Sequence, residues 1–524
     1  MKKKIISLLL AVVMIVGMLP LGAITAFAAE SDIRNKWNDT LVSGTYGYVR
    51  SSDLHGAPDH PDELADGEIN FQYYPLDDAD DFEYCFRENC SKSGRKLKKV
   101  YEIHLFADFE PTSFIADAMV MRIYLNGHTL NIKGDAEVSV NPAIKPPKDF
   151  QILGDGGMIS FPNNTKASAF TLEANTGLSG NAHSYEVENV TFSGCKGRVF
   201  NFYTTDVVLA TLNNITFKNC SADYGSCIYI NSNEVRLQAN SCSFINCTAY
   251  QSGGAVYIKN VKAAMDRFQS FNNCTVKNCK ANGTSSTGKG DGGGFIYVAD
   301  SEAYAGIYHT DISDCSGKYG GAIYNYGDNV FFENSTAHGC EASNDGGFLY
   351  NYNDGAYVHI TDSAISDCEA KNGNGGGIYT NGKLADLENS VIRSCKATGY
   401  GGGLYVANTS ALVNNFEKDT KAAAQEDASN HGYTVISGCS AKYGGGVYAA
   451  DVDLLQNIIF ADNQSTYHGG GLYNYTGAGA ASTVNNCRFY RNTALNNYYG
   501  GGIYINDSDG TVENCQFFEN IVQE

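Results

Sequence analysis

The sequence predicts an all-β protein, a parallel β-solenoid of about twelve regular coils of three short strands, preceded by irregular initial coils. Gly and Tyr are unusually frequent, with 57 and 35 of the 524 residues, and such a bias is typical of one unit copied many times. A hydrophobic fraction of 43% with only 9 Pro supplies ample material for a core and argues against a disordered chain.

Two short motifs alternate strictly along the chain and define the repeating unit. In the first motif, an apolar residue is followed three positions later by Cys or Asn, and twelve copies occur, mostly 24 to 29 residues apart. Their apolar residues are Phe192, Phe217, Phe244, Val276, Ile312, Ala337, Ile365, Ile392, Ile436, Phe460, Phe489 and Phe517. The second motif is a Gly pair, a small residue, an aliphatic residue and Tyr, as in Gly320 to Tyr324. No helical pattern of useful length competes with this repeat.

Residue spacing within the unit predicts three corners between its strands. Inward-facing residues lie five and two positions before the Phe position, and side chains alternate faces along a strand, so a corner must separate positions three apart. The residue at that corner is usually Asn, which tolerates the left-handed conformation. These residues are Asn189, Asn214, Asn273, Asn334, Asn389, Asn457, Asn486 and Asn514. The Phe-x-x-Cys step and the Gly pair supply the other two corners.

The 16 cysteines follow the repeat rather than a disulfide framework. In nine consecutive coils, from Cys195 to Cys439, Cys occupies the same column. Coils stack about 4.8 Å apart, which brings adjacent thiols into disulfide range but with parallel Cβ vectors, a poor geometry for the bond. A thiol packs well as a small hydrophobe, so we predict a column of buried free thiols.

Three segments are expected along the chain. Three lysines precede an uncharged apolar run, and Ala26 and Ala28 supply the small residues of a cleavage site, which is typical of a secretory signal peptide. An uncleaved membrane anchor is the alternative. The next segment lacks the repeat, is acidic, and carries Cys85 and Cys90. The predicted segments are a signal peptide at 1–28, an N-terminal lead-in or cap at 29–97, and the repeat domain at 98–524.

Charge and hydropathy limit the partners of the protein. The formal net charge of −20 makes nucleic acid and anionic membranes poor partners, because binding to them rests on neutralising phosphate groups. No second apolar run of membrane length follows the leader. We therefore expect an extracellular protein, secreted or associated with the cell surface, without an integral membrane segment after signal cleavage.

The alternation of Phe-x-x-Asn with Gly-Gly-Ala-Ile resembles the repeat of the polymorphic outer membrane protein (Pmp-like) adhesins. Phe460 to Asn463 and Phe489 to Asn492 carry the first signature, and Gly320 to Ile323 carries the second. The stretch Tyr124 to Leu130 looks like the first coil of right-handed, pectin-lyase-like β-helix proteins. The resemblance covers about residues 100–524. It implies a right-handed single-stranded parallel β-helix, a surface adhesin and an outer-membrane location, although Cys replaces Asn in most copies.

Candidates for catalysis on an acidic polysaccharide are weak. Hydrolysis needs two carboxyl groups about 5 to 9.5 Å apart, and Asp314 and Asp367 share a column two coils apart, roughly 9.6 Å by coil spacing. Solvated surface Asp residues are the simpler interpretation. Elimination needs a cluster of basic residues, whereas the arginines are scattered. His468 is the one ring to inspect as a base, although a surface role is the simpler interpretation. We expect no catalytic residue and no cofactor.

No metal site is expected from the sequence. The Gly-rich run at 287–294 lacks the residue order of a calcium-binding nonapeptide and does not repeat. Cys85 and Cys90 form a single pair, which is too few ligands for zinc.

The Tyr residues of the second motif are the features with functional potential. The aliphatic residue before each Tyr faces inward, so alternation predicts an exposed outward stripe of rings. Such rings suit flat ligands such as glycans and are enriched at protein contacts, whereas rings that only reinforce the sheet are the alternative. The candidate ligand-binding residues are Tyr324, Tyr326, Tyr350, Tyr352, Tyr405, Tyr473, Tyr475 and Tyr504. We predict a non-catalytic adhesin that attaches to glycans or proteins of a host or neighbouring cell. A polysaccharide lyase or glycoside hydrolase and a structural surface spacer are the alternatives.

Overall fold

The computed structural model describes most of the repeat region and two strands before it. The described residues are 47–51, 72–76, 100–111, 114–118, 121–134, 136–140, 150–162, 168–172, 183–204, 207–232, 234–259, 269–283, 291–300, 303–327, 329–353, 355–409, 412–413, 433–477, 481–506 and 510–524. The predicted signal peptide, Cys85 and Cys90, and most of the predicted cap lie outside these ranges.

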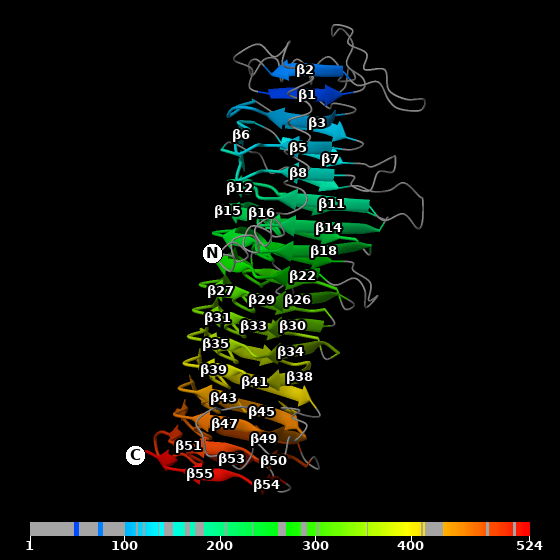
Figure 1. The fold of residues 1–524 in the computed structure, drawn as a ribbon. Coiled ribbons are helices and arrows are strands. Elements are labelled where there is room, and N and C mark those ends of the chain that lie inside the picture. Colours follow the sequence, from blue (N-terminus) through cyan, green and yellow to red (C-terminus); the bar gives the residue numbers. More distant parts are fainter. Residues whose placement is uncertain are drawn as a thin grey trace, which may run out of the picture.

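The described strands form long parallel sheets that run the length of a column (Figure 1). Sheet A comprises β2 (Gln72–Leu76), β1 (Gly47–Ser51), β3 (Val100–Leu105), β5 (Met121–Tyr124), β8 (Phe150–Leu153), β11 (His183–Glu188), β14 (Val208–Asn213), β18 (Val235–Asn240), β22 (Gln269–Asn272), β26 (Tyr304–Tyr308), β30 (Asn329–Glu333), β34 (Tyr357–Thr361) and β38 (Lys383–Glu388). Sheet E continues along the chain with β42 (Leu412–Val413), β46 (Leu454–Gln456), β50 (Thr483–Asn485) and β54 (Thr511–Glu513).

The second long sheet carries the Tyr motif. Sheet B comprises β4 (Phe114–Ala118), β7 (Ala136–Val140), β10 (Phe170–Leu172), β13 (Phe200–Phe202), β17 (Ile228–Asn231), β21 (Val256–Lys259), β25 (Ile296–Val298), β29 (Ile323–Asn325), β33 (Leu349–Asn351), β37 (Ile378–Thr380), β41 (Leu404–Thr409), β45 (Val447–Val452), β49 (Leu472–Tyr475) and β53 (Ile503–Asn506).

The third long sheet carries the Phe position. Sheet C comprises β6 (Thr129–Asn131), β9 (Met158–Ser160), β12 (Thr191–Ser193), β15 (Thr216–Lys218), β19 (Ser243–Ile245), β23 (Thr275–Lys277), β27 (Asp311–Ser313), β31 (Thr336–His338), β35 (Ala364–Ser366), β39 (Val391–Arg393), β43 (Thr434–Ser437), β47 (Ile458–Ala461), β51 (Arg488–Tyr490) and β55 (Gln516–Phe518). With one strand of sheet C in each coil, its 14 strands comprise the regular coils and the irregular initial ones.

The fourth sheet is made of very short strands. Sheet D comprises β16 (Ser221–Tyr224), β20 (Thr248–Ser252), β24 (Lys280–Ala281), β28 (Ser316–Gly317), β32 (Glu341–Ala342), β36 (Glu369–Ala370), β40 (Lys396–Ala397), β44 (Ser440–Ala441), β48 (Gln464–Ser465), β52 (Thr493–Ala494) and β56 (Ile521–Val522).

One coil visits sheets A, C, D and B in that order, as β14, β15, β16 and β17 do. The all-β solenoid is therefore confirmed, but the prediction of three strands per coil was wrong. The fourth strand is the segment between Cys and the Gly pair. It is as short as two residues, and in such strands Glu341 and Ala342 pair in parallel with Glu369 and Ala370. Two residues are too few to show a periodicity of two in the sequence.

The three predicted corners are present. All eight corner Asn residues between sheets A and C have positive φ, from 45° at Asn389 to 59° at Asn457. A second corner lies just before each Cys or Asn of the column and also has positive φ, for example 54° at Asp314. The third corner needs Gly. At Gly320, with φ of 60°, a Cβ atom would lie 1.9 Å from the carbonyl oxygen of Ile323.

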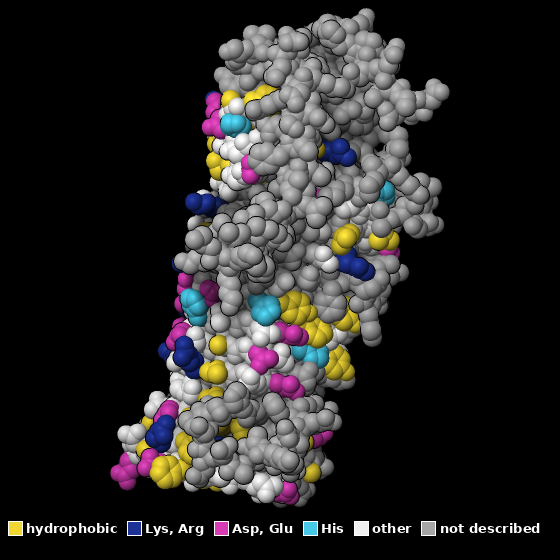
Figure 2. All heavy atoms as spheres, in the orientation of Figure 1, with side chains coloured by type: hydrophobic (Ala, Val, Ile, Leu, Met, Phe, Trp, Pro, Cys, Tyr) yellow, Lys and Arg dark blue, Asp and Glu magenta, His cyan; other side chains and the backbone are white. Residues whose placement is uncertain are grey.

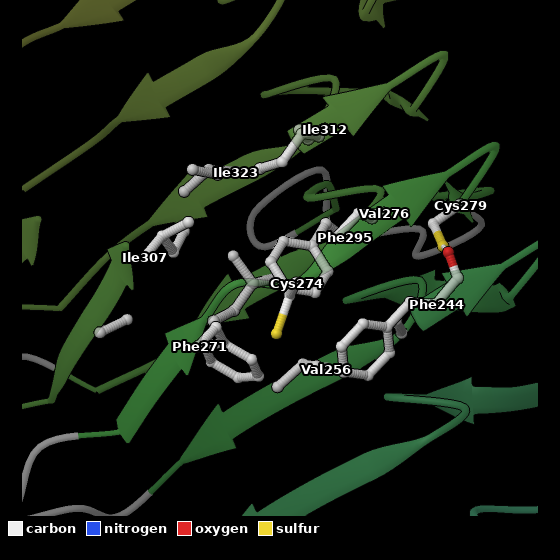
Figure 3. Close-up of a cluster of buried hydrophobic side chains, with 14 of the residues drawn as sticks. Phe244, Val256, Phe271, Cys274, Val276, Cys279, Phe295, Ile307, Ile312 and Ile323 are labelled. Atoms are coloured by element: carbon white, nitrogen blue, oxygen red, sulfur yellow. Dashed lines mark hydrogen bonds between the residues drawn. The ribbon is translucent and has the colours of Figure 1, made fainter. Parts of the chain in front are cut away.

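The core consists of columns in which like side chains stack on like. Phe244, Val276 and Ile312 are register partners in successive strands of sheet C and point into the interior (Figure 3). Near the C-terminal end, the rings of Phe460 and Phe489 stack with centroids 4.7 Å apart. No disulfide joins the cysteines of the described ranges, and nearly all of these cysteines are buried.

The N-terminal edge of sheet A differs from the rest of the solenoid. Strand β1 pairs antiparallel with β3 and with β2, whereas β3 pairs in parallel with β5. These two strands belong to the segment expected to form a cap, and they occupy the hydrogen-bonding edge of the first coil. An antiparallel pair at that edge interrupts the parallel stacking that would otherwise offer an open template.

Candidate functional site

The Tyr residues of the second motif form one continuous ladder on the outward side of sheet B. They are register partners from strand to strand, as Tyr324 is with Tyr297 and Tyr350. The ring centroids of Tyr297 and Tyr324 lie 4.5 Å apart, and those of Tyr350 and Tyr379 lie 4.8 Å apart. The ladder runs through Tyr229, Tyr257, Tyr297, Tyr324, Tyr350, Tyr379, Tyr405, Tyr448, Tyr473 and Tyr504.

The prediction that the ladder is exposed was wrong for its central members. Tyr324 is only 3% exposed to solvent and Tyr350 only 7%, and Tyr297 and Tyr473 are also buried. Each ring shields the faces of its neighbours. In addition, a second row of rings from the corner before the Gly pair packs against the ladder. It includes Tyr319, 5.0 Å from Tyr350 between centroids, Tyr400, 4.8 Å from Tyr448, and Tyr443, 5.6 Å from Tyr473.

Burial has an electrostatic consequence for the ladder. It raises the pKa of Tyr297, Tyr324 and Tyr350 above the ordinary range of a phenol. These side chains therefore stay protonated at neutral pH. Stacked neutral rings stabilise the sheet as cross-strand aromatic pairs do. Because both faces of a central ring are covered by its neighbours, a sugar cannot stack on it.

The exposed candidates lie beside the ladder. Tyr326 and Tyr475 are 39% and 38% exposed, and Tyr352 is partly buried. Each lies two residues after a ladder Tyr. The rings of Tyr326 and Tyr352 stack with centroids 5.5 Å apart and planes 20° apart. Tyr405 and Tyr504 are partly buried members of the ladder itself. The structure thus separates the eight candidates into a covered group and a group that a ligand can reach.

Charged or polarisable groups close both ends of the ladder. At Tyr229 the guanidinium carbon of Arg198 lies 3.6 Å from the ring centroid, in cation–π geometry. At Tyr504 the imidazole of His468 stacks with centroids 4.5 Å apart. The Nδ1 atom of His468 accepts a hydrogen bond from the backbone N–H of Tyr499 at 3.1 Å, and burial lowers the pKa of His468. The His468 ring is thus held in place by stacking on Tyr504 and by the hydrogen bond at its Nδ1 atom, as a packing role requires.

The carboxylates considered for hydrolysis lie at corners. Asp314 and Asp367 occupy the same corner column, with φ of 54° and 55°, and both are exposed. Gly339 holds the corner of the coil between them, and a Cβ atom there would lie 2.9 Å from Asp314 Oδ1. Their positive φ values explain why Asp occurs there, since Asn and Asp tolerate this conformation better than most other residues that carry a Cβ atom.

Sequence reasoning missed an aromatic cluster on the outward side of sheet A. Phe331 of β30 and His359 of β34 are register partners, and their rings stack with centroids 4.4 Å apart. Tyr357 lies two residues before His359 on the same side. In Figure 2, hydrophobic, histidine and acidic side chains gather at the level of β26, β30 and β34. The alternation within NVFFE and YVHIT was the signal that could have identified these residues.

Sequence reasoning also missed a group of three sulfur atoms inside the coil. Cys220 and Cys247 belong to the predicted column, whereas Cys227 lies outside it, directly before strand β17. All three are buried, and their Sγ atoms lie within 4.8 Å of one another. Cys227 lies outside the repeat motif that defines the column and meets the column thiols only in space, so the repeat spacing gives no sign of it.

These geometries define a class of protein, the right-handed parallel β-helix. Residues 237–420 match the family model for a right handed beta helix region. This agrees with the handedness implied by the resemblance to pectin-lyase-like proteins. Neither the comparison with curated proteins nor the comparison with solved structures gives a match. Within the described ranges, no helix is long and apolar enough to cross a membrane.

Proposed function

We propose that this β-helix is an exported, adhesin-like binding protein that acts outside the cell, either secreted or at its surface. It attaches to carbohydrate or protein on a neighbouring surface through exposed Tyr rings beside the ladder and has no catalytic activity. The observation that supports this most directly is the stacked pair of Tyr326 and partly buried Tyr352, together with the exposed ring of Tyr475. Amphipathic rings on a rigid support lose little conformational entropy on binding.

The ladder supplies the rigidity that such a surface needs. The buried rings of Tyr324 and Tyr350 are fixed by neighbours on both sides. Tyr326 and Tyr352 follow these rings by two residues, so their backbone positions repeat with the coil. A surface that repeats along the solenoid suits an extended polymer with its own repeat, such as a polysaccharide.

Charge and site geometry support a binding role rather than catalysis. The corner carboxylates of Asp314 and Asp367 are exposed and have an intervening Gly corner. Arg198 is engaged over Tyr229, and Arg491 forms two 2.7 Å contacts with Asp462. The net charge of −20 also repels a polyanionic substrate. Incubation with uronate-containing polymers should release neither unsaturated products nor reducing ends, and turnover in either assay would show an enzyme instead.

The binding role is tested by removing only the exposed rings. The variant Tyr326→Ser/Tyr352→Ser/Tyr475→Ser should lose tenfold or more of its apparent affinity for glycans or cells, roughly the effect of a small group of aromatic hot-spot residues. The matched control is Tyr250→Ser, which removes an exposed ring from β20 of sheet D, away from the ladder and its neighbouring column. Binding to a glycan array and to whole cells measures the effect. Equal binding by the two variants would contradict the proposal.

A structural spacer is the second candidate, and the burial of the central ladder favours it. Tyr324→Ser should destabilise the fold by about 3 kcal/mol, because it removes a buried ring from a close-packed column. Tyr324→Phe keeps the stack and should cost much less. If the exposed-ring variant and the unmodified protein both fail to bind glycans and cells, while Tyr324→Ser lowers the unfolding midpoint in urea, the spacer is the better description.

A further inference from the structure

The sulfur atoms of three buried cysteines lie close together where two neighbouring coils meet. Cys220 and Cys227 belong to one of these coils, and Cys247 belongs to the next. The Sγ atoms lie within 4.8 Å of one another, and those of Cys227 and Cys247 are 3.3 Å apart. Cys220 and Cys247 stack in neighbouring coils at the corner between sheets C and D. Cys227 faces them from the start of β17 in sheet B. The thiols therefore approach from two sides of the coil rather than along one column.

The position of Cys227 faces the thiol column in other coils too. Its counterparts include Gly377 and Gly403, where a Cβ atom would lie 3.4 Å and 3.2 Å from the Sγ atoms of Cys395 and Cys439. Further counterparts are Ala255, Phe295, Ala322 and Phe348, which carry no metal ligand. Within the described ranges, the coil of Cys227 is thus the place where a third sulfur joins the column.

We propose that Cys220, Cys227 and Cys247 bind one soft, thiophilic metal ion of the Cu(I) class in three-coordinate geometry. Three sulfur atoms that each lie about 2.3 Å from an ion in their plane are about 4 Å apart, and the Sγ atoms of this group lie within 4.8 Å of one another. Thiolates select soft ions such as Cu(I). Structural zinc takes four ligands, and the described residues supply three here.

Protons govern the occupancy of this site. Cysteine ligates a metal as the thiolate, so each sulfur gives up its proton to solvent as its bond to the ion forms. Binding replaces protons with the ion and leaves the oxidation state of sulfur unchanged. We therefore expect binding to release protons and to become tighter as the pH rises.

The experiment uses the full chain, reduced and refolded without oxygen in the presence of Cu(I) and then challenged with a competing Cu(I) chelator. Metal retained per chain is measured by elemental analysis, and thiolate-to-metal charge transfer is followed in the near ultraviolet. The unmodified protein should retain about one ion per chain, and Cys227→Ala should retain none. Ala already occupies this position at Ala255 and Ala322, so the variant should fold, which circular dichroism checks.

The matched control is Cys340→Ala, which removes a buried column thiol four coils away from Cys227 and should retain the ion. Zn(II) in place of Cu(I) should be lost to a chelator of comparable strength. Three results would overturn the proposal: no retained Cu(I), equal retention by Cys227→Ala, or a disulfide between Cys227 and Cys247 in protein mapped without reductant. Loss of the bound ion in both Cys227→Ala and Cys340→Ala would also overturn the proposal, because the ion would then depend on the whole thiol column and not on these three cysteines.

Discussion

The same buried column is filled by thiols in one part of the solenoid and by amides in the other. From Cys195 to Cys439 it holds Cys, and at Asn463, Asn492 and Asn520 it holds Asn. The Oδ1 atom of Asn492 accepts hydrogen bonds from the backbone N–H and from the Nδ2 group of Asn463, each at 3.0 Å. The Nδ2 group of Asn492 donates hydrogen bonds to the carbonyl oxygen of Phe460 and to Asn520 Oδ1, each at 2.9 Å.

The thiols make longer and weaker contacts in the same place. Cys279 Sγ lies 3.4 Å from the carbonyl oxygen of Phe244 and 3.7 Å from that of Lys277. A thiol behaves largely as a small hydrophobe, whereas a buried amide must be fully hydrogen-bonded. The same backbone geometry therefore accommodates either a hydrophobic thiol or a hydrogen-bonded amide at this position. The two parts should differ in their response to pH and to truncation.

Alkaline pH should produce the largest difference. Hydrogen bonds from neighbouring thiols lower the pKa of Cys340 and Cys395. Burial raises the pKa of a larger set of column thiols, which decides the sign of the pH dependence: Cys279, Cys315, Cys368 and Cys439. Below about pH 8.5 these thiols are protonated in both the folded and the unfolded chain, and their contribution to stability is complete. Above that pH the unfolded chain loses protons that the folded chain keeps, so stability falls by up to about 1.4 kcal/mol per thiol and pH unit.

The urea midpoint should therefore fall steeply between pH 7.5 and 9.5, as followed by far-ultraviolet circular dichroism. The variant Cys315→Ser/Cys368→Ser removes two titrating groups and should give a shallower dependence. A midpoint that stays constant or rises over this range would contradict the burial of the thiol column.

Truncation in the amide column should have the next largest effect. Asn492→Ala removes four hydrogen bonds and leaves buried donors and acceptors on its neighbours, at about 1 to 3 kcal/mol for each unsatisfied group. We expect a loss of about 4 kcal/mol. Cys395→Ala in the thiol column should lose about 1 to 2 kcal/mol, mainly from packing.

The control for both truncations is Gln464→Ala, whose side chain is exposed in sheet D and whose removal should change little. Urea unfolding followed by circular dichroism ranks the three variants. If Cys395→Ala lowers the free energy of unfolding as much as Asn492→Ala does, the thiols stabilise the fold by more than their packing.

Corner substitutions should cause the smallest loss of stability, and the loss should be similar in the thiol part and in the amide part of the solenoid. Asn334, beside the thiol column, and Asn486, beside the amide column, have φ of 48° and 49°. Ala at either position should cost about 1 to 2 kcal/mol, because a Cβ-bearing residue without a polar side chain disfavours this conformation.

Gly avoids that strain, so Asn334→Gly should cost less than Asn334→Ala. Asn486→Ala should cost slightly more than Asn334→Ala, because Asn486 Nδ2 also donates to Asn457 Oδ1 at 2.7 Å. Thermal unfolding of the four proteins measures the difference. Equal losses for Ala and Gly would show that conformation does not determine the residue at this corner.

The repeat made much of the fold predictable from sequence. Positions three apart that both face inward required a corner, and all eight Asn residues assigned to it have positive φ. The same alternation placed the Tyr ladder on the outward side of sheet B. Sheet D was missed because strands such as Glu341–Ala342 are too short to show a periodicity.

The candidate site was less predictable because burial depends on neighbours in other coils. Alternation fixes the side of the sheet on which Tyr324 and Tyr350 lie, but it does not show that Tyr319 packs against both of them. The sulfur group was missed for a related reason. Cys227 joins Cys220 and Cys247 only through the spatial proximity of sheet B to the corner between sheets C and D.

The central claim is that the cysteines serve as stacked thiols in the core rather than as disulfides. Alkylation of the unfolded protein without reductant, followed by peptide mass mapping, tests it directly. Each cysteine from Cys195 to Cys439 should carry one alkyl group. Disulfide-linked peptides between column neighbours, such as Cys315 with Cys340, would contradict the account.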